Sequence, residues 1–394
     1  MKAWLILADG TIFEGTSIGA TGKTIGETVF TTGMTGYLET LTDPSYYGQI
    51  VTQTFPLIGN YGDIPVDYES NKCWVRGYIV RELCDLPSNF RCSGTLGDFL
   101  RTQNIVGICG IDTRALTKRL RESGVMNGMI VSGEESNKIL KQVQDDETAC
   151  HAELVSASIL EEIKAYKIEQ AVESVQQNTD GGVTGVSPVE RVATNEVGAQ
   201  GETSPSKSIV LWDFGAKANI QRELEKRGCR VTVVPCTTTA DEILALKPDG
   251  LMLSNGPGDP ADNVKIIEEL KKICNVGTVP IFGICLGHQM LALARGCKTS
   301  KLKYGHRGGN HPCKDTETGR VYITSQNHGY AVENTSLPSY AKMSFFNVND
   351  GTVEGITYTD IPAFSVQFHP EACGGPHDTN FLFDRFMQSI YSKS

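Results

Sequence analysis

A cysteine, a histidine and a glutamate in the second half of the chain have the residue types of a catalytic triad. Cys285 lies in the run Gly283-Ile284-Cys285-Leu286-Gly287-His288-Gln289, and the run Gln367-Phe368-His369-Pro370-Glu371 places a histidine 84 residues later. A thiolate attacks carbonyl carbons, an imidazole serves as its base, and a carboxylate orients the imidazole. The three residues therefore predict acyl transfer through a thiol.

The neighbours of Cys285 predict that its thiol lies at a strand-to-helix turn. Residues 279–284 form an apolar run typical of a buried strand, and residues 286–294 have a helical pattern. Glycines two positions before and two after Cys285 permit a sharp bend, and the dipole of the following helix favours a thiolate. A cysteine after an apolar strand is more often a core residue, so the catalytic interpretation depends on these glycines and on a base nearby.

Two further segments follow apolar strands. His369 and Glu371 come after the run 363–368, and by themselves they would be read as a buried histidine with a surface glutamate. The run Ser254-Asn255-Gly256-Pro257-Gly258-Asp259-Pro260 is an ordinary turn in one interpretation. In the other, its glycines let backbone N–H groups approach an oxyanion. Because strand ends meet at one edge of a parallel sheet, the three segments together favour a catalytic site.

Composition limits what else the chain does. Its 394 residues predict two domains, and its 40% hydrophobic and 21% charged residues are typical of a globular protein without a membrane span. A net charge of −10 without a basic stripe argues against nucleic-acid binding. The N-terminus lacks a signal-peptide pattern, and the 12 cysteines include no Cys-x-x-Cys pair, so a reduced, cytoplasmic protein is expected.

No metal or nucleotide site is predicted in this chain. His306, His311 and Cys313 lie close together in a Gly-rich segment, but they lack partner cysteines at zinc-finger spacing. The chain also has no Gly-x-x-x-x-Gly-Lys-Ser/Thr loop. Any ATP chemistry is therefore expected on another chain.

The elements expected to position the site divide the chain into three parts. Residues 1–133 form a sheet-rich α+β domain, with strands expected at 28–32, 49–52, 74–80 and 105–108 and helices at 95–103 and 113–122. Residues 134–208 match no clear pattern; they are expected to be partly helical up to 171, with a flexible linker over 176–208. Residues 209–394 alternate strands and helices, which predicts a doubly wound parallel α/β domain. Its expected strands are 209–212, 231–234, 250–253, 279–283 and 363–368, and its expected helices are 217–227, 240–246, 262–274 and 286–294.

From residue 209 onward, the segments around Cys285, His369 and Gly256 together resemble the class I glutamine amidotransferase domain. The resemblance implies that Cys285 attacks the side-chain amide of glutamine, while His369, oriented by Glu371, assists thiolate formation and protonates the departing ammonia. It also implies that the backbone N–H groups of Leu286 and Gly256 stabilise the oxyanion. By the same resemblance, the glutamine is held by further residues, namely Gly258, Gln289, Asn327, Gly329 and Tyr330.

The N-terminal part contains four motifs, Gly33-Met34-Thr35-Gly36-Tyr37, Leu41-Thr42-Asp43-Pro44-Ser45-Tyr46, Gln53-Thr54-Phe55-Pro56 and Ile58-Gly59-Asn60-Tyr61-Gly62. Together they resemble the small, glutamine-hydrolysing subunit of carbamoyl phosphate synthetase. Two motifs after residue 208 are similar to the same subunit, namely Asp213-Phe214-Gly215-Ala216-Lys217 and the run from Tyr304 to Pro312. On its own, Asp43-Pro44-Ser45 reads as a turn or a helix N-cap. The resemblance implies instead that Ser45 reaches the glutamine site.

The resemblance implies a cytoplasmic subunit that acts in a heterodimer. It would hydrolyse glutamine and deliver ammonia to a separate large synthetase subunit, which makes carbamoyl phosphate from bicarbonate and ATP for arginine and pyrimidine synthesis. ATP and Mg²⁺ are expected on that partner, and no cofactor is expected in this chain. Two alternatives stay open: an amidotransferase that serves another acceptor, and a non-catalytic regulatory partner of the synthetase.

Overall fold

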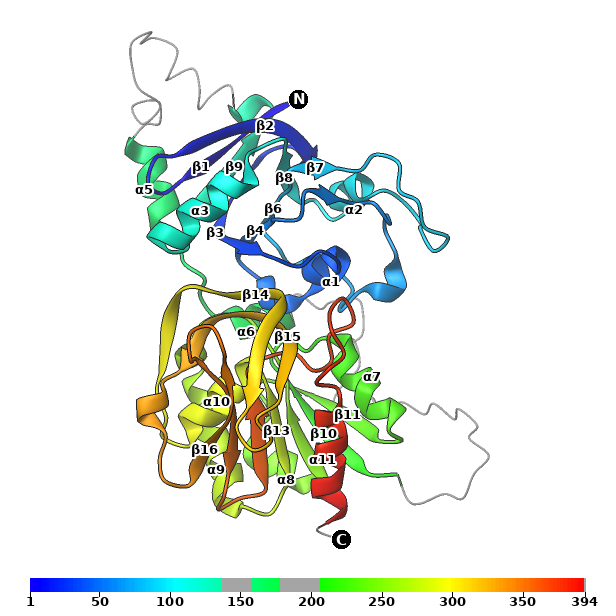
Figure 1. The fold of residues 1–394 in the computed structure, drawn as a ribbon, viewed down its shortest axis with the longest axis vertical. Helices are drawn as coiled ribbons and strands as arrows, with labels where there is room; N and C mark the ends of the chain where they lie inside the picture. The colour runs from blue at the N-terminus through cyan, green and yellow to red at the C-terminus, as the bar shows by residue number, and fades with distance from the viewer. Residues whose placement is uncertain (137–156, 178–205, 393–394) are drawn as a thin grey trace. The chain divides into compact units, whose positions relative to one another are not determined.

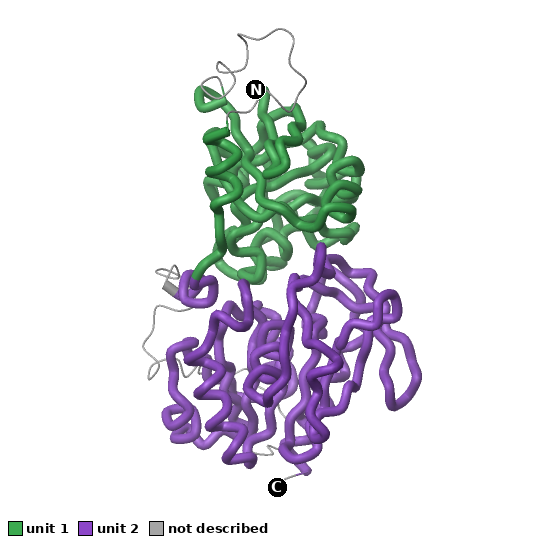
Figure 2. Tube along the Cα trace, turned by 90° about the vertical axis from the view of Figure 1, so that its left-hand side faces the viewer, with its two compact units in different colours: residues 1–169 green, residues 170–394 purple. Residues whose placement is uncertain are grey.

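The computed structural model describes residues 1–136, 157–177 and 206–392. The chain forms two compact units, Met1–Glu169 and Gln170–Ser394, which Figure 2 colours separately. Helix α5 (Ala157–Ala165) belongs to the first unit and α6 (Ala171–Gln177) to the second, although the sequence placed both within the region 134–208. Of the flexible linker predicted over 176–208, residues 178–205 lie outside the described part of the chain.

The first unit is built on a closed barrel of strands in the order β1-β2-β8-β6-β4-β3-β9. Strands β3, β4, β6 and β8 run parallel in succession, and the remaining neighbours are antiparallel. The barrel strands are β1 (Lys2–Leu7), β2 (Ile12–Gly19), β3 (Lys23–Thr31), β4 (Gln49–Gln53), β6 (Gly77–Ile79), β8 (Val106–Cys109) and β9 (Met126–Ser132), and β5 (Leu57–Ile58) pairs separately with β7 (Glu82–Leu83).

Helices α1 (Tyr37–Thr42), α2 (Leu96–Thr102) and α3 (Thr113–Ser123) accompany this barrel (Figure 1). The N-cap side chains of Thr95 and Asp112 begin α2 and α3, and Gly124 ends α3 with a positive φ of 93°. The prediction of these two helices is confirmed to within one residue. The predicted strand at 74–80 is shorter in the structure, and α1 had no predicted counterpart.

The second unit contains a nine-stranded sheet in the order β11-β10-β12-β13-β18-β17-β16-β14-β15. Its first five strands are parallel, as predicted, and they are β10 (Ser208–Asp213), β11 (Arg230–Pro235), β12 (Gly250–Leu253), β13 (Ile281–Ile284) and β18 (Ala363–Val366). The other four add an antiparallel extension that the sequence did not predict, formed by β14 (Thr299–Asp315), β15 (Val321–Val332), β16 (Ala341–Asn347) and β17 (Val353–Tyr358).

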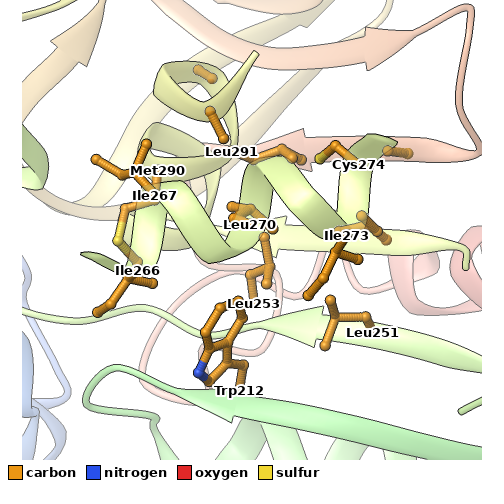
Figure 3. Packing of buried hydrophobic residues seen from close by; sticks show 14 of the residues in the cluster. Trp212, Leu251, Leu253, Ile266, Ile267, Leu270, Ile273, Cys274, Met290 and Leu291 are labelled. Carbon is orange, nitrogen blue, oxygen red and sulfur yellow. The ribbon is translucent and has the colours of Figure 1, made fainter. Parts of the chain in front are cut away.

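Helices cover both faces of the parallel strands, which makes this part doubly wound as predicted. Alternation along the strands directs Trp212 and Leu253 to one face and Leu211 and Met252 to the other. The first face packs against α8 (Ala240–Ala245), α9 (Val264–Val276) and α10 (Leu286–Ala294), and Figure 3 shows the tryptophan beneath the α9 side chains. The second packs against α7 (Ala218–Lys226) and α11 (Phe381–Tyr391).

Within the described residues, no helix combines the length and apolar character needed to cross a bilayer.

Candidate active site

Cys285 lies between β13 and α10, at the strand-to-helix turn that the sequence predicted. Its φ of 53° and ψ of −104° are unusual for a residue with a side chain. The flanking glycines are required by close packing: a Cβ on Gly287 would lie 2.5 Å from the carbonyl oxygen of Leu253, and one on Gly283 would lie 2.9 Å from that of Gly287. The backbone is therefore bent sharply at Cys285.

The strand pairing brings His369 and Glu371 to the same edge of the sheet. Strand β18 runs parallel to β13, and Cys285 N donates to the carbonyl oxygen of Val366 at 2.9 Å. Three residues further on, Nδ1 of His369 lies 2.7 Å from Oε1 of Glu371, and both side chains are almost fully buried. Because a carboxylate accepts at Nδ1, this nitrogen carries a proton and Nε2 is left for proton transfer.

The charges at the site favour an imidazolium next to a carboxylate. Burial and Lys217 lower the pKa of His369, but Glu371 and Cys285 outweigh them and raise it to about 10. For Glu371, burial raises the pKa, but His369 and Lys217 bring it below its usual value. The histidine can therefore hold a proton beside the thiol at neutral pH.

Lys217 is a member of the site that sequence reasoning did not assign. Its Nζ lies 3.3 Å from Nδ1 of His369 and 3.6 Å from Oε1 of Glu371, and its side chain is buried. The backbone N–H of Lys217 donates to Oδ1 of Asn255, which fixes it at the start of α7. The motif that contains Lys217 was noted in the sequence, but only the fold reveals a buried amine beside a histidine 152 residues away.

The predicted oxyanion donors are neighbours. Gly256 follows β12, and a Cβ at this position would lie 2.3 Å from the carbonyl oxygen of Phe214 and 2.7 Å from Cδ2 of Leu286. Gly258 has a φ of 90°, which favours glycine, and an added Cβ would meet Ala171 of α6 at 2.8 Å. The structure thus places Gly256 next to the side chain of Leu286, the first residue of α10.

Among the predicted glutamine-binding residues of the second unit, Asn327 contacts the thiol directly, and Gln289 and Tyr330 are connected to it through Gln367. Sγ of Cys285 donates to the carbonyl oxygen of Asn327 at 3.6 Å, and Nε2 of Gln367 contacts Sγ at 3.7 Å. Nε2 of Gln289 donates to the carbonyl oxygen of Tyr330 at 2.7 Å and to Oε1 of Gln367 at 2.9 Å. Gln367 was quoted in the sequence motif but was not assigned a role.

Gly329 and Ser45, the other two residues predicted to bind glutamine, lie in different surroundings. Gly329 lies between Asn327 and Tyr330 on β15, where an added Cβ would meet a guanidinium nitrogen of Arg307 at 3.4 Å. Ser45 lies in the first unit, buried in a 3₁₀ turn (Pro44–Tyr46) that Asp43 caps through its contact with Ser45 N. The N-cap interpretation of Asp43 is confirmed, whereas the role of Ser45 in glutamine binding stays a prediction.

Among the described residues, His306, His328 and Glu354 form a buried group whose potential ligand atoms lie within 4.8 Å of one another. Nε2 of His306 lies 2.8 Å from Asp350 and Nδ1 lies 3.3 Å from Glu354. Burial lowers the pKa of His306, but these carboxylates raise it to about 9. In the absence of a metal, the protonated His306 forms an ion pair with Asp350 and Glu354.

Comparisons with known proteins match both halves of the chain. Residues 210–389 match the family model for class-I glutamine amidotransferases, and residues 5–130 match that for the CPSase domain of the carbamoyl-phosphate synthase small chain. Carbamoyl phosphate synthase small chains are 46% identical in Symbiobacterium thermophilum (98% of this chain, 97% of the relative) and 48% identical in Clostridium perfringens (98% and 99%). A solved glutamine amidotransferase from Thermotoga maritima is 16% identical over 48% of this chain and 86% of that chain, with a TM-score of 0.36.

Proposed function

The chain belongs to the family of carbamoyl phosphate synthase small chains, and from this premise we propose that Cys285, His369 and Glu371 perform its glutamine hydrolysis. A small chain with a class-I amidotransferase domain is the glutamine-hydrolysing subunit of its enzyme. The observation that carries the residue assignment is the buried contact of 2.7 Å between Nδ1 of His369 and Oε1 of Glu371, beside a cysteine with strained backbone.

The reaction proceeds in two halves. The thiolate of Cys285 attacks the side-chain amide carbon of glutamine, and the carbonyl oxygen becomes an oxyanion. When the C–N bond breaks, His369 gives its proton to the nitrogen, so that ammonia leaves and a γ-glutamyl thioester remains. Water, deprotonated by the now neutral His369, attacks the thioester, and glutamate departs as the thiolate is restored. Glu371 keeps the proton on Nδ1 throughout, which directs every transfer through Nε2.

The backbone N–H groups of Leu286 and Gly256 stabilise the oxyanion in this proposal. The closeness of Gly256 to the Leu286 side chain and the position of Leu286 at the start of α10 support it, because the free N–H groups of a helix N-terminus favour negative charge. Gln289, Asn327, Gly329, Tyr330 and Gly258 bind the glutamine, and Ser45 of the first unit contributes a hydroxyl.

The ammonia is used by a large synthetase subunit, which forms a heterodimer with this chain and makes carbamoyl phosphate from bicarbonate. The match of residues 5–130 supports this acceptor over another amidotransferase reaction. ATP and Mg²⁺ bind to the partner, and this chain needs no cofactor, since nucleophile, base and acid are all side chains of its own. The pair works in the cytoplasm. A purely regulatory partner would have no need of a buried Cys-His-Glu arrangement.

Glutamate release from glutamine by the purified chain, alone and with its synthetase, tests the proposal. The rate should rise when the synthetase, bicarbonate and ATP are added. Cys285→Ser should abolish glutamate release while the complex still uses ammonium ions to make carbamoyl phosphate. Cys297→Ser, which changes a buried cysteine of the core between the sheet and helices α8 to α10, is the matched control and should keep glutamate release. Undiminished release by Cys285→Ser would refute the triad.

A further inference from the structure

Glu354 on β17 is a fully buried carboxylate that the proposed reaction does not use. Both of its oxygens are occupied. Oε1 lies 3.3 Å from Nδ1 of His306 and accepts from Asn347 at 3.3 Å, while Oε2 lies 3.0 Å from Nε2 of Gln326. The buried group therefore ties three neighbouring strands together.

His306 is held from two sides. It lies opposite His328 in the register of β14 and β15, and shifts in this register occur both before it and after Gly308. Nε2 of its ring lies 2.8 Å from Asp350, a carboxylate whose side chain is 44% exposed. The His306 imidazole thus lies between Asp350, at the surface of the second unit, and Glu354, in its interior.

From Glu354, hydrogen bonds continue along two routes to the nucleophile. The first runs through the backbone, because the carbonyl oxygen of Glu354 accepts from Gln367 N at 2.9 Å and the side chain of Gln367 contacts Sγ of Cys285 at 3.7 Å. One residue, Gln367, is therefore bonded to Glu354 through its backbone and to the thiol through its side chain. The position of Glu354 on β17 bears directly on the position of Gln367.

The second route runs through side chains. The side chain of Gln326 links Glu354 to His328. Its Nε2 lies 3.0 Å from Oε2 of Glu354, and its Oε1 lies 3.0 Å from Nε2 of His328. Nδ1 of His328 lies 2.7 Å from the carbonyl oxygen of Tyr330, and that oxygen also accepts from Gln289. Hydrogen bonds from Glu354 through Gln326 and His328 thus hold the segment that contributes Asn327 and Tyr330 to the site.

We propose that Glu354 and His306 are positioning residues that hold the segment 326–330 of β15 against the Cys285 thiol and thereby set the affinity for glutamine. This inference rests on the proposed function. A buried ion pair is weak support for stability, because well-packed apolar residues of similar volume often replace one without loss. An apolar side chain at position 354 cannot fix the orientation of Gln326 and His328. These two residues hold the segment 326–330 beside the thiol.

The protons of this group specify which substitution should preserve it. His328 has a carbonyl oxygen at each ring nitrogen, although burial lowers its pKa well below the usual value and leaves the ring one proton only. In a Glu354→Gln variant, the amide at position 354 can donate to a reversed Gln326, whose own amide then donates to Nε2 of His328. The side-chain carbonyl oxygen at position 354 still accepts from His306 and Asn347, so the variant satisfies the same partners.

The test compares Glu354→Leu with Glu354→Gln in the complex with the synthetase. The leucine variant should raise the KM for glutamine about tenfold with a smaller change in kcat. This is expected when the residues that position the glutamine-binding segment lose a buried hydrogen-bonding partner. The glutamine variant should keep KM within about twofold, because its amide restores the chain of donors and acceptors. Glu223→Leu, which changes a buried carboxylate paired with Arg227 instead, should leave KM unchanged.

Two further measurements keep the inference separate from folding and from the proposed function. If Glu354→Leu fails to fold, His306→Gln should raise KM in the same direction. Alkylation of Cys285 by iodoacetamide, followed by peptide mass spectrometry, should be faster in Glu354→Leu than in Glu354→Gln, whether or not glutamine is hydrolysed. An unchanged KM and alkylation rate in the leucine variant, or equal changes in both Glu354 variants, would overturn the inference. Absence of glutamine hydrolysis by the wild-type complex would refute the proposed function alone.

Discussion

The amine of Lys217 and the carboxylate of Glu371 approach each other to 3.6 Å on the same side of the His369 imidazole. Each meets Nδ1 of His369, the amine at 3.3 Å and the carboxylate at 2.7 Å. The carboxylate stabilises the imidazolium and the amine opposes it. Besides burial and the Cys285 thiol, the balance of two buried charges of opposite sign therefore sets the acidity of His369.

Replacing Lys217 by methionine should disturb this balance. Without the amine, the pKa of His369 rises further, so the imidazolium gives its proton to departing ammonia less readily. We expect kcat/KM for glutamate release to fall roughly tenfold, with the basic limb of its pH profile moved to higher pH. Lys217→Arg retains the charge and should leave the limb near its wild-type position. A limb that stays in place in Lys217→Met would contradict the electrostatic role.

The backbone at Cys285 predicts that function costs stability. Glycine adopts a positive φ readily, whereas a side chain at φ 53° and ψ −104° is strained. Cys285→Gly should therefore be more stable than Cys285→Ala by about 1 kcal/mol, although both lack the thiol. Urea unfolding of the two variants measures the difference. Greater stability of the alanine variant would show that the turn is not strained.

The pH dependence of stability should report on His306. Asp350 and Glu354 overcome the effect of burial and raise the pKa of His306 to about 9, above the ordinary value of about 6.5. Since the folded state binds this proton more tightly, the contribution is fully present below about pH 6.5 and is lost as pH rises through about 9. The contribution amounts to at most about 3 kcal/mol by linkage.

Comparison with His306→Gln isolates this contribution. Denaturant unfolding between pH 6 and 10 should show wild-type stability falling towards that of the variant, because only the wild type loses the proton. Parallel curves for the two proteins would mean that His306 is neutral in the folded state. In that case the ion pair with Asp350 and Glu354 would be absent.

Much of the candidate site was predictable, because its residues directly follow parallel strands. The alternation of strands and helices along the sequence indicates those strands. Cys285, Gly256 and His369 each come after an apolar run, and parallel strands end at one edge. The long antiparallel pair β14 and β15 was not predictable in this way. The run from Tyr304 to Pro312 is rich in glycine and reads as a loop, and only pairing with β15, through two register shifts, makes it a strand.

The roles of Lys217, Gln367 and Glu354 were hidden for a related reason. A buried lysine is rare and gives no local signal, since its partners His369 and Glu371 lie more than 150 residues away in the chain. Glu354 lies on a strand whose other residues are mostly buried and give no local signal. Their significance arises from which strands become neighbours, and that is decided by tertiary packing.

Gly256 offers the sharpest test of the oxyanion site. A methyl group here would lie 2.3 Å from the carbonyl oxygen of Phe214 and 2.7 Å from Leu286, so Gly256→Ala must shift the peptide that is proposed to donate to the oxyanion. Misplacing one such donor should lower kcat about 10²-fold, and KM should change much less because the oxyanion exists only after attack. Gly94→Ala, whose added Cβ would meet nothing within 4 Å, is the control for a glycine-to-alanine change. Steady-state glutamate release by both variants decides the matter: a kcat near wild type in a folded Gly256→Ala protein would remove Gly256 from the oxyanion site and leave the amide of Leu286 as its remaining proposed donor.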